Sequence, residues 1–243
     1  MADEPEESSH RPGQETKPVH MGRRTVLGIL GLAGIGIAVG AKVDNALGSV
    51  SSAVSNAIGV PLPGDDQFRF YTVTGSYPVI PADTYELTVD GMVREPLRLR
   101  LADLRSMGRT KLVHQFQCVT GWVVPDVHWE GVLLSDVLEH AGVTRKATAL
   151  RFFSADGIYT ESLSLSQARL PDILVADRML GADVTADHGG PVRLYAAPMY
   201  GYKSIKWLNR IEVTDKVVDG YWEGYGYPAD AWIGGSAPVS VVP

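Results

Sequence analysis

Apolar and polar residues alternate in the central part of the chain, and this pattern predicts short β-strands. Tyr85, Leu87 and Val89 alternate with polar residues immediately before Asp90-Gly91. A period of two residues is typical of a strand with one face buried, and an Asp-Gly pair after such a run is typical of a hairpin turn. We therefore expect a half-buried strand that leads into a hairpin.

A second hairpin is predicted farther along the chain. Residues 149–154 and 158–163 are segments with strand character on either side of Asp156-Gly157. Other segments with strand character predict further strands or extended stretches, at 68–75, 111–117, 191–196 and 205–214.

Short helices are predicted between these strands. Residues 101–107 form one, and Ser135 as the cap with Gly142 as the stop predict another of about two turns. Its apolar face is expected to consist of Val137, Leu138 and Ala141. Ser164 and Gln167 have the spacing of a capping box. Many short strands with scattered short helices predict an α+β fold built around mixed sheets.

The first 66 residues divide into three segments of different composition. Residues 1–22 are polar and are expected to be disordered. Arg23-Arg24 precedes an uncharged run, so that 23–41 resembles the twin-arginine export signal of bacteria. A membrane anchor or a buried helix is the alternative for this segment. Residues 42–66 indicate a linker, and the folded domain is expected to occupy 67–243.

The overall composition is that of a globular protein. The chain has 243 residues, of which 45% are hydrophobic and 21% charged, enough to bury a sizeable core. Its formal net charge of −6 gives no reason to expect nucleic-acid binding, which usually requires a basic patch.

Cys118 is the single cysteine and lies where a predicted strand ends and a Gly-Trp turn begins. It can pack in the core, act as a nucleophile with His114 or His128 as its base, or ligate a metal. A zinc site is disfavoured, because CxxC and HExxH spacings are absent. A single thiolate can instead anchor a metal whose remaining ligands come from a cofactor.

Four segments together resemble the molybdopterin-binding oxidoreductase domain of the sulfite oxidase family. They are FRFYT (68–72), QCVTGW (117–122), HGGPVR (188–193) and YGYKSIKWL (200–208). The resemblance covers roughly 67–232 and is closest to the exported bacterial branch, the catalytic subunits of periplasmic methionine-sulfoxide reductases. It implies a molybdenum–molybdopterin cofactor with Cys118 as the metal ligand and a catalytic residue, since soft sulfur suits a redox metal.

The resemblance also implies a set of cofactor-binding residues. Arg193, Lys203 and Lys206 would supply positive charge to the pterin phosphate. The alternative is that both lysines are solvated and that His188 is an ordinary loop residue. The complete set, in chain order, is Tyr71, Thr72, Cys118, Ser154, His188, Arg193, Lys203, Ser204, Ile205 and Lys206.

The C-terminal aromatic segment resembles the closing segment of the family, in which a tyrosine at the metal site follows a tryptophan by five residues. Counting from Trp222, this register selects Tyr227 as a catalytic residue, with Tyr225 as the second choice. A phenol there could hydrogen-bond to a substrate. The alternative is aromatic packing that closes the domain.

The surroundings of the cysteine favour a neutral substrate. No Lys or Arg occurs between 112 and 144, whereas Val123 and Val124 follow the cysteine closely. A desolvated anion such as sulfite would need a compensating charge, which distant basic residues could still bring. We therefore expect reduction of a sulfoxide, with methionine sulfoxide or a small molecule as substrate. Sulfite oxidation and a cofactor-free cell-surface binding module are the alternatives.

The sequence also predicts the partners of such an enzyme. It contains no CxxCH haem motif and no second cysteine for an iron–sulfur cluster. Electrons are therefore expected to come from a separate partner, with a membrane haem protein as the candidate. We further expect a monomer, exported across the cytoplasmic membrane to the periplasm or cell surface.

Overall fold

The computed structural model describes residues 68–235. The predicted polar leader (1–22), export signal or anchor (23–41) and linker (42–66) lie outside the described residues. No helix within 68–235 is both long enough and apolar enough to cross a membrane.

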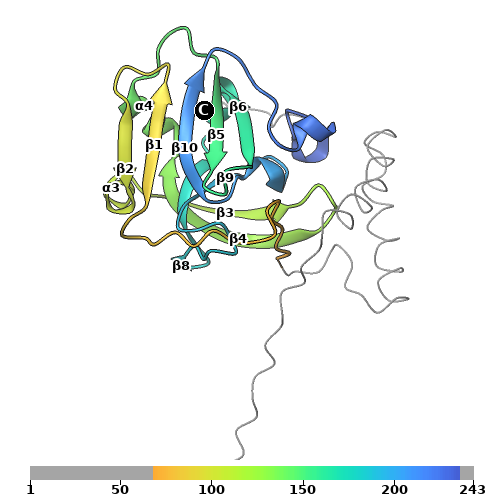
Figure 1. The fold of residues 1–243 in the computed structure, drawn as a ribbon. Coiled ribbons are helices and arrows are strands. Elements are labelled where there is room, and N and C mark those ends of the chain that lie inside the picture. Colours follow the sequence, from red (N-terminus) through yellow and green to blue (C-terminus); the bar gives the residue numbers. More distant parts are fainter. Residues whose placement is uncertain (1–67, 236–243) are drawn as a thin grey trace, which may run out of the picture.

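Five strands form the first sheet, which contains the strands drawn upright in Figure 1. Their order across the sheet is β2 (Leu97–Arg100), β1 (Glu86–Gly91), β10 (Leu208–Thr214), β5 (Ala149–Ser154) and β6 (Thr160–Ser164). Strands β1 and β10 are parallel, and the other neighbours are antiparallel. This mixture confirms the expected mixed sheet.

The second sheet lies across the lower end of the first in Figure 1. It consists of β3 (Thr110–Gln117), β4 (Val123–Leu133), β7 (Ile173–Met179), β8 (Ala182–Asp183) and β9 (Arg193–Ala196), with β9 paired to β7. The hairpin of β3 and β4 is the longest pairing in the described chain and carries the cysteine at the end of β3.

The helices are short. Within residues 68–235, three are α-helical, α3 (Leu101–Ser106), α4 (Leu134–Ala141) and α5 (Leu165–Ala168), and three are 3-10 turns, η1 (Gly201–Lys203), η2 (Glu223–Tyr225) and η3 (Ile233–Gly235). The predicted capping box is confirmed at α5, where the Ser164 and Gln167 side chains bond each other's backbone. Ser135 is not the cap of α4, because the N-cap position is Leu133, two residues earlier, and it makes no side-chain bond. Gly142 ends α4 with φ 65°, as expected for a left-handed cap.

The predicted hairpin around Asp156-Gly157 is present as β5 and β6. Strand β1 also forms a hairpin with β2, but Asp90-Gly91 is not its turn, because both residues belong to β1 and pair with β10, and the turn lies at 92–96. Other strand predictions needed correction. Tyr85, Leu87 and Val89 are 2%, 0% and 0% exposed, which confirms the alternation. Residues 68–75 form no strand, because no neighbouring strand supplies ladder hydrogen bonds to them. Strands β4 and β7 were not predicted, although both lie inside the second sheet.

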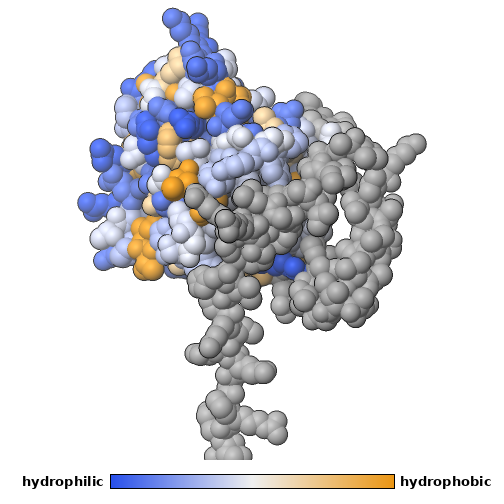
Figure 2. All heavy atoms as spheres, turned by 45° about the vertical axis from the view of Figure 1, so that its right-hand side comes forward, coloured by the Kyte–Doolittle hydropathy of each residue, from blue (hydrophilic) through white to orange (hydrophobic). Residues whose placement is uncertain are grey.

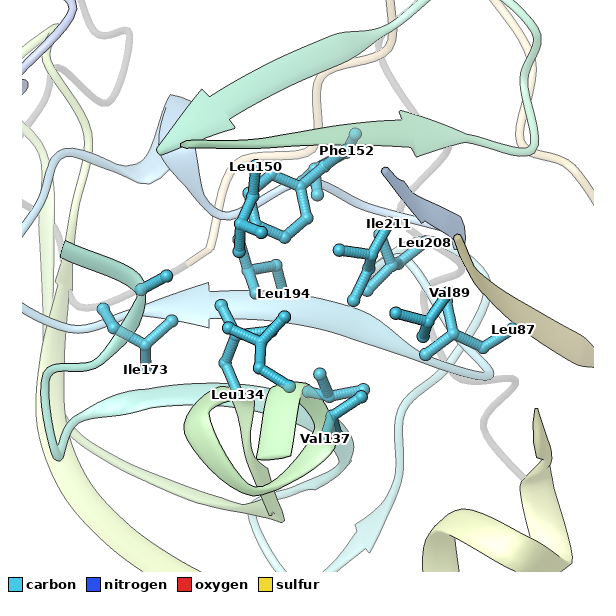
Figure 3. Packing of buried hydrophobic residues seen from close by; sticks show 14 of the residues in the cluster. Leu87, Val89, Leu134, Val137, Leu150, Phe152, Ile173, Leu194, Leu208 and Ile211 are labelled. Carbon is cyan, nitrogen blue, oxygen red and sulfur yellow. The ribbon is translucent and has the colours of Figure 1, made fainter. Parts of the chain in front are cut away.

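The main core fills the space between the two sheets and α4. Figure 3 shows Leu134 and Val137 of α4 pointing toward Leu194 of β9, with Leu150 of β5 beyond it. Burial of each such side chain contributes roughly 1.5–3 kcal/mol, so this cluster supplies much of the stability. On the face shown in Figure 2, hydrophobic residues form separate small patches among hydrophilic ones.

A second, more aromatic core lies beneath the cysteine. Phe116, Trp122, Trp129 and Tyr195 are buried in it, and Cys118 packs against its edge. Trp129 and Tyr195 stack with ring centroids 4.3 Å apart, and Phe116 stacks on Trp122 at 5.7 Å. Rigid aromatic packing of this kind fixes the end of β3 and thereby the position of the sulfur.

Candidate metal and cofactor site

Cys118 is the first residue after β3 and begins a tight turn back into β4. Its amide donates to the Trp122 carbonyl at 2.9 Å, and the Gly121 amide donates to its carbonyl at 3.0 Å. Gly121 has φ 96°, a conformation that glycine adopts without strain. The cysteine therefore lies at a strand end, as predicted, with its backbone fully bonded.

The thiol of Cys118 is half-buried and has one hydroxyl directed at it. Burial raises the pKa of this thiol, while the Thr120 hydroxyl, which donates to Sγ at 3.2 Å, acts in the opposite direction. The positive charge of Arg69 also lowers the pKa. A thiolate is the form that ligates a metal, so these two groups favour ligation.

Neither histidine considered as a base lies near the sulfur. His114 pairs with Val127 and lies four positions before Cys118, which at about 3.4 Å per strand residue separates the Cα atoms of His114 and Cys118 by roughly 14 Å. His128 pairs with Val113, one position farther along β3. A base must lie within hydrogen-bond reach of its nucleophile, so the structure gives no support to a cysteine–histidine pair.

Arg193 is buried at the first position of β9 and donates hydrogen bonds to the backbone of two neighbouring loops. Its guanidinium donates to the carbonyls of His188 at 2.6 Å, Ser204 at 2.8 Å and Leu194 at 3.3 Å. It also lies over the rings of Phe116 and Trp129. Burial lowers the pKa of Arg193 to about 10, which leaves it charged at neutral pH. Arg193 thus ties together the loops that carry two other predicted site residues.

Lys206 brings a positive charge to the same region. Its ammonium donates to the Asp187 carbonyl at 2.6 Å and to the Tyr71 carbonyl at 3.4 Å, and it faces the rings of Phe70 and Trp207. Burial and the charge of Arg193 lower the pKa of Lys206 to about 7. A bound anion would restore the charged form, which suits a residue that meets a phosphate.

His188 packs edge-on against Phe68 and Phe70, with ring centroids 4.8 and 4.7 Å away. Its amide donates to the Asp187 carboxylate at 3.0 Å, and its carbonyl accepts from Arg193. The segment 68–70 therefore closes over the histidine loop and brings its own residues to the cysteine.

The titration of His188 should make stability depend on pH. Burial, together with the positive charges of Arg193 and Lys206, lowers its pKa from 6.5 to about 4 against the opposing effect of Asp187. Between these values the unfolded chain binds the extra proton, so stability is complete above pH 6.5 and is lost as the pH falls toward 4. We expect the unfolding free energy from urea titrations to fall over this window, and less steeply in His188→Gln. Equal falls in both proteins would contradict this assignment.

Lys203 does not face a phosphate, which corrects the prediction that it adds charge to the cofactor site. The side chain is 1% exposed, and its ammonium donates to Glu161 at 2.7 Å and to Glu223 at 2.5 Å. Both carboxylates are buried, and burial raises the pKa of Glu161 to about 8. The positive charge of Lys203 is therefore paired with carboxylates inside the protein.

Three other predicted cofactor residues are buried and make hydrogen bonds within the protein. The Ser204 hydroxyl accepts from the Ala196 amide at 3.0 Å, and the Ile205 carbonyl accepts from Leu194 at 2.9 Å. The Ser154 hydroxyl accepts from the Asp156 amide at 3.2 Å, within the hairpin turn. These three contacts stabilise the loops of the site from inside.

Tyr71 and Thr72 lie on the outer side of the site. Burial raises the pKa of Tyr71, and the Cys118 charge raises it further, so the phenol is near the sulfur and keeps its proton. Its ring lies 6.4 Å from that of Trp122. The Thr72 hydroxyl donates to the Ser76 carbonyl at 3.0 Å, within its own loop.

Tyr227 is half-buried and interacts electrostatically with the cysteine, whereas Tyr225 is 61% exposed. Burial raises the pKa of Tyr227, and the negative charge of Cys118 raises it further. Its ring packs against Trp222 at 5.6 Å and Tyr202 at 5.5 Å. A phenol that keeps its proton is a hydrogen-bond donor for a ligand.

Sequence reasoning missed three charged residues of this region. Arg69 acts electrostatically on Cys118 and Tyr71, so the site does contain a positive charge that no residue between 112 and 144 supplies. Glu161 and Glu223 hold Lys203. Arg69 lies within FRFYT, one of the four segments that resemble the family. Glu161 and Glu223 belong to no recognisable sequence motif, because they become neighbours only in the fold.

The described chain resembles proteins of one enzyme class. The family model for the oxidoreductase molybdopterin binding domain matches residues 74–222. An uncharacterized oxidoreductase, YuiH, of Bacillus subtilis is 32% identical over 171 residues, covering 66% of this chain and 86% of its own length. The protein-methionine-sulfoxide reductase catalytic subunit MsrP of Gluconobacter oxydans is 27% identical over 248 residues, covering 88% of this chain and 78% of the relative.

Two further proteins extend the comparison. Sulfite oxidase of Arabidopsis thaliana is 28% identical over 183 residues, which span 61% of this chain but only 47% of the plant protein. The crystal structure of the sulfane dehydrogenase SoxCD from Paracoccus pantotrophus superimposes with a TM-score of 0.55 at 23% identity, over 59% of this chain and 41% of that one. This structural match supports the fold.

Proposed function

Because this chain belongs to the family of oxidoreductase molybdopterin-binding domains and is a molybdopterin-dependent oxidoreductase of the sulfite oxidase family, we propose that it reduces a sulfoxide by oxygen-atom transfer. The observation that carries the proposal is the single cysteine at the end of β3, half-buried and in contact with a hydroxyl donor. Arg69 lowers the pKa of this cysteine, and the charge of the cysteine raises the pKa values of Tyr71 and Tyr227.

The residues present fit a molybdenum–molybdopterin cofactor. Cys118 offers a soft sulfur ligand, and Lys206 offers an ammonium whose reduced pKa an anion would restore. Arg193 holds the backbone of the His188 and Ser204 loops between them. When bound, the cofactor supplies the two-electron redox chemistry, while the protein binds and orients the reactants.

Tyr227 is the residue we assign to proton transfer at the substrate. In the reduction the S=O bond breaks, sulfur gains two electrons, and the oxygen takes up two protons and leaves as water. The Tyr227 phenol keeps its proton at neutral pH, since burial and the Cys118 charge raise its pKa. Its hydroxyl can therefore donate a hydrogen bond to the sulfoxide oxygen.

The preference for a neutral substrate rests on the apolar surroundings of the cysteine. Trp122 is buried, and Val123 and Val124 follow directly in β4. A protein methionine sulfoxide fits this environment, in keeping with the relatives named protein-methionine-sulfoxide reductase. Arg69 is the one observation that favours an anion, so sulfite oxidation at the same site is the second candidate.

The electrons would come from a separate protein, and the reaction would take place outside the cytoplasmic membrane. The sequence holds one cysteine and no haem motif, so the chain carries no second redox centre of these kinds. The twin-arginine-like segment 23–41 suits export of a folded protein that already holds its cofactor.

A substrate comparison tests this function directly. Protein from a host that makes the cofactor is assayed with methionine sulfoxide, dimethyl sulfoxide, trimethylamine N-oxide and sulfite, using an artificial electron carrier. We expect a higher kcat/KM with methionine sulfoxide than with sulfite, because a neutral substrate loses less solvation than an anion in apolar surroundings. A preference for sulfite would favour the second candidate. A folded protein without molybdenum or pterin would favour a binding module instead.

A further inference from the structure

The segment 198–203, which ends in η1, runs antiparallel to the C-terminal tail and binds it at four points. The contacts join Pro198 to Ile233, Tyr200 to Ala231, Tyr202 to Pro228 and Lys203 to Glu223. The first three are hydrogen bonds of 3.1, 2.9 and 2.7 Å, and the fourth is an ion pair of 2.5 Å. Contacts of both backbone and side chains therefore attach the tail along its length.

Tyr227 lies between the last two of these contacts. Tyr202 packs on its ring from one side at 5.5 Å and donates its hydroxyl to the carbonyl of the next residue, Pro228. Trp222 packs at 5.6 Å, and the Tyr227 amide donates to the Trp222 carbonyl at 3.3 Å. The phenol position thus depends on how η1 holds the tail on both sides of it.

The beginning of η1 touches the strand that carries the cysteine. A Cβ atom at Gly201 would lie 2.5 Å from Cζ of Phe116 and 3.4 Å from the carbonyl oxygen of Gln117, the residue before Cys118. The absence of a side chain at Gly201 therefore lets η1 pack directly on the end of β3. This one turn contacts the cysteine strand at one end and the tyrosine segment at the other.

The ion pair that closes this arrangement is buried. The side chains of Lys203 and Glu223 are 1% and 3% exposed, and Glu161 of β6 binds the same ammonium at 2.7 Å. Oε2 of Glu223 has no hydrogen-bond partner among the described residues. The Glu223 side chain consequently depends on Lys203, and loss of either charge would leave the other buried without full compensation.

We propose that Tyr202, Lys203 and Glu223 are positioning residues that fix the Tyr227 phenol relative to Cys118. They act through Tyr227 and do not touch the substrate themselves. The inference rests on the proposed function in one respect, because it takes Tyr227 as the group whose placement matters for turnover.

The first test follows the thiol without the cofactor. Cys118 is the single cysteine, so the rate of alkylation by iodoacetamide reports on this site alone. In full-length protein from a host that cannot make the cofactor, we expect Glu223→Gln and Tyr202→Phe each to alkylate several-fold faster than the wild type. Asp177→Asn is the matched control, since it removes a buried carboxylate that pairs with Arg105 and Arg109 at the other end of β3 and should leave the rate unchanged. Unchanged rates in both variants, or an equal rise in the control, would overturn the inference.

The second test separates positioning from general stability in the loaded enzyme. Tyr227→Phe should lower kcat about 100-fold, the lower range for a lost general acid. Glu223→Gln should lower kcat in the native background but cause no further loss in the Tyr227→Phe background. Fully additive losses would overturn the positioning role. If Tyr227→Phe retained full turnover while both variants still accelerated alkylation, the structural inference would stand and the catalytic role of Tyr227 would fail.

Discussion

Cys118→Ser is expected to abolish turnover while leaving the protein folded and able to hold pterin. Serine keeps the shape of the side chain but replaces a soft thiolate by a hydroxyl that stays protonated at neutral pH, so the metal loses its protein ligand. Substituting a residue that only hydrogen-bonds to a metal ligand typically lowers metal affinity or activity about 10–100-fold. Loss of the ligand itself should therefore lower kcat more than about 100-fold. Steady-state assays with methionine sulfoxide and fluorescence of released pterin measure the two properties.

A substitution at an exposed position of the same strand provides the control for Cys118→Ser. Val113 lies on β3 and is 52% exposed, so Val113→Ser should leave turnover and melting temperature close to those of the native protein. Full activity of Cys118→Ser would refute the ligand assignment. Loss of activity together with loss of the folded state would be recognised from circular dichroism.

Arg193→Ala is expected to destabilise the protein and to lower its cofactor content together. Three carbonyls, those of His188, Leu194 and Ser204, lose their donor, and each buried unsatisfied group costs about 1–3 kcal/mol. A total loss of about 3–5 kcal/mol should lower the melting temperature by roughly 10 °C, since 1 kcal/mol corresponds to about 2–4 °C in a domain of this size. Molybdenum per folded chain should fall as well, because the loops that hold the site are no longer joined.

Two variants show whether the effect of Arg193→Ala is specific. Arg193→Lys keeps the charge but lacks the planar fork that reaches several carbonyls, so it should not restore the native properties. Arg98→Ala removes an arginine that is 75% exposed in a surface pair with Glu86, and such a pair contributes about 0.2–1 kcal/mol. A native melting temperature and molybdenum content in Arg193→Ala would contradict the assigned role.

Local signals in the sequence predicted those parts of the fold that local interactions decide. The alternation of Tyr85, Leu87 and Val89 identified β1, because a period of two residues places one set of side chains in the core. The Ser164 and Gln167 spacing identified the start of α5, since both bonds of a capping box form within four residues.

The missed and misplaced strands depended on partners far away in the chain. Strand β7 is buried on both sides, and its first four residues, 173–176, are all apolar and show no alternation. Strand β4 contains Pro125 and Asp126, which by themselves indicate a loop, yet β3 and β7 pair with it on either side. Residues 68–75, predicted as a strand or an extended stretch, have the composition of a strand but no partner strand, so propensity alone could not decide between the two.

At the site, the sequence by itself determined the chemical groups and the family to which they belong, and the tertiary structure decided what each charge does. Cys118 and its place at a strand end could be predicted, since the turn that follows it is encoded in neighbouring residues. Lys203 could not be assigned correctly, because the two carboxylates that bind it come from 42 and 20 positions away. Arg69 reaches the cysteine across a similar separation. A charge acts through its nearest partners and its burial, and for distant residues only the folded chain fixes both.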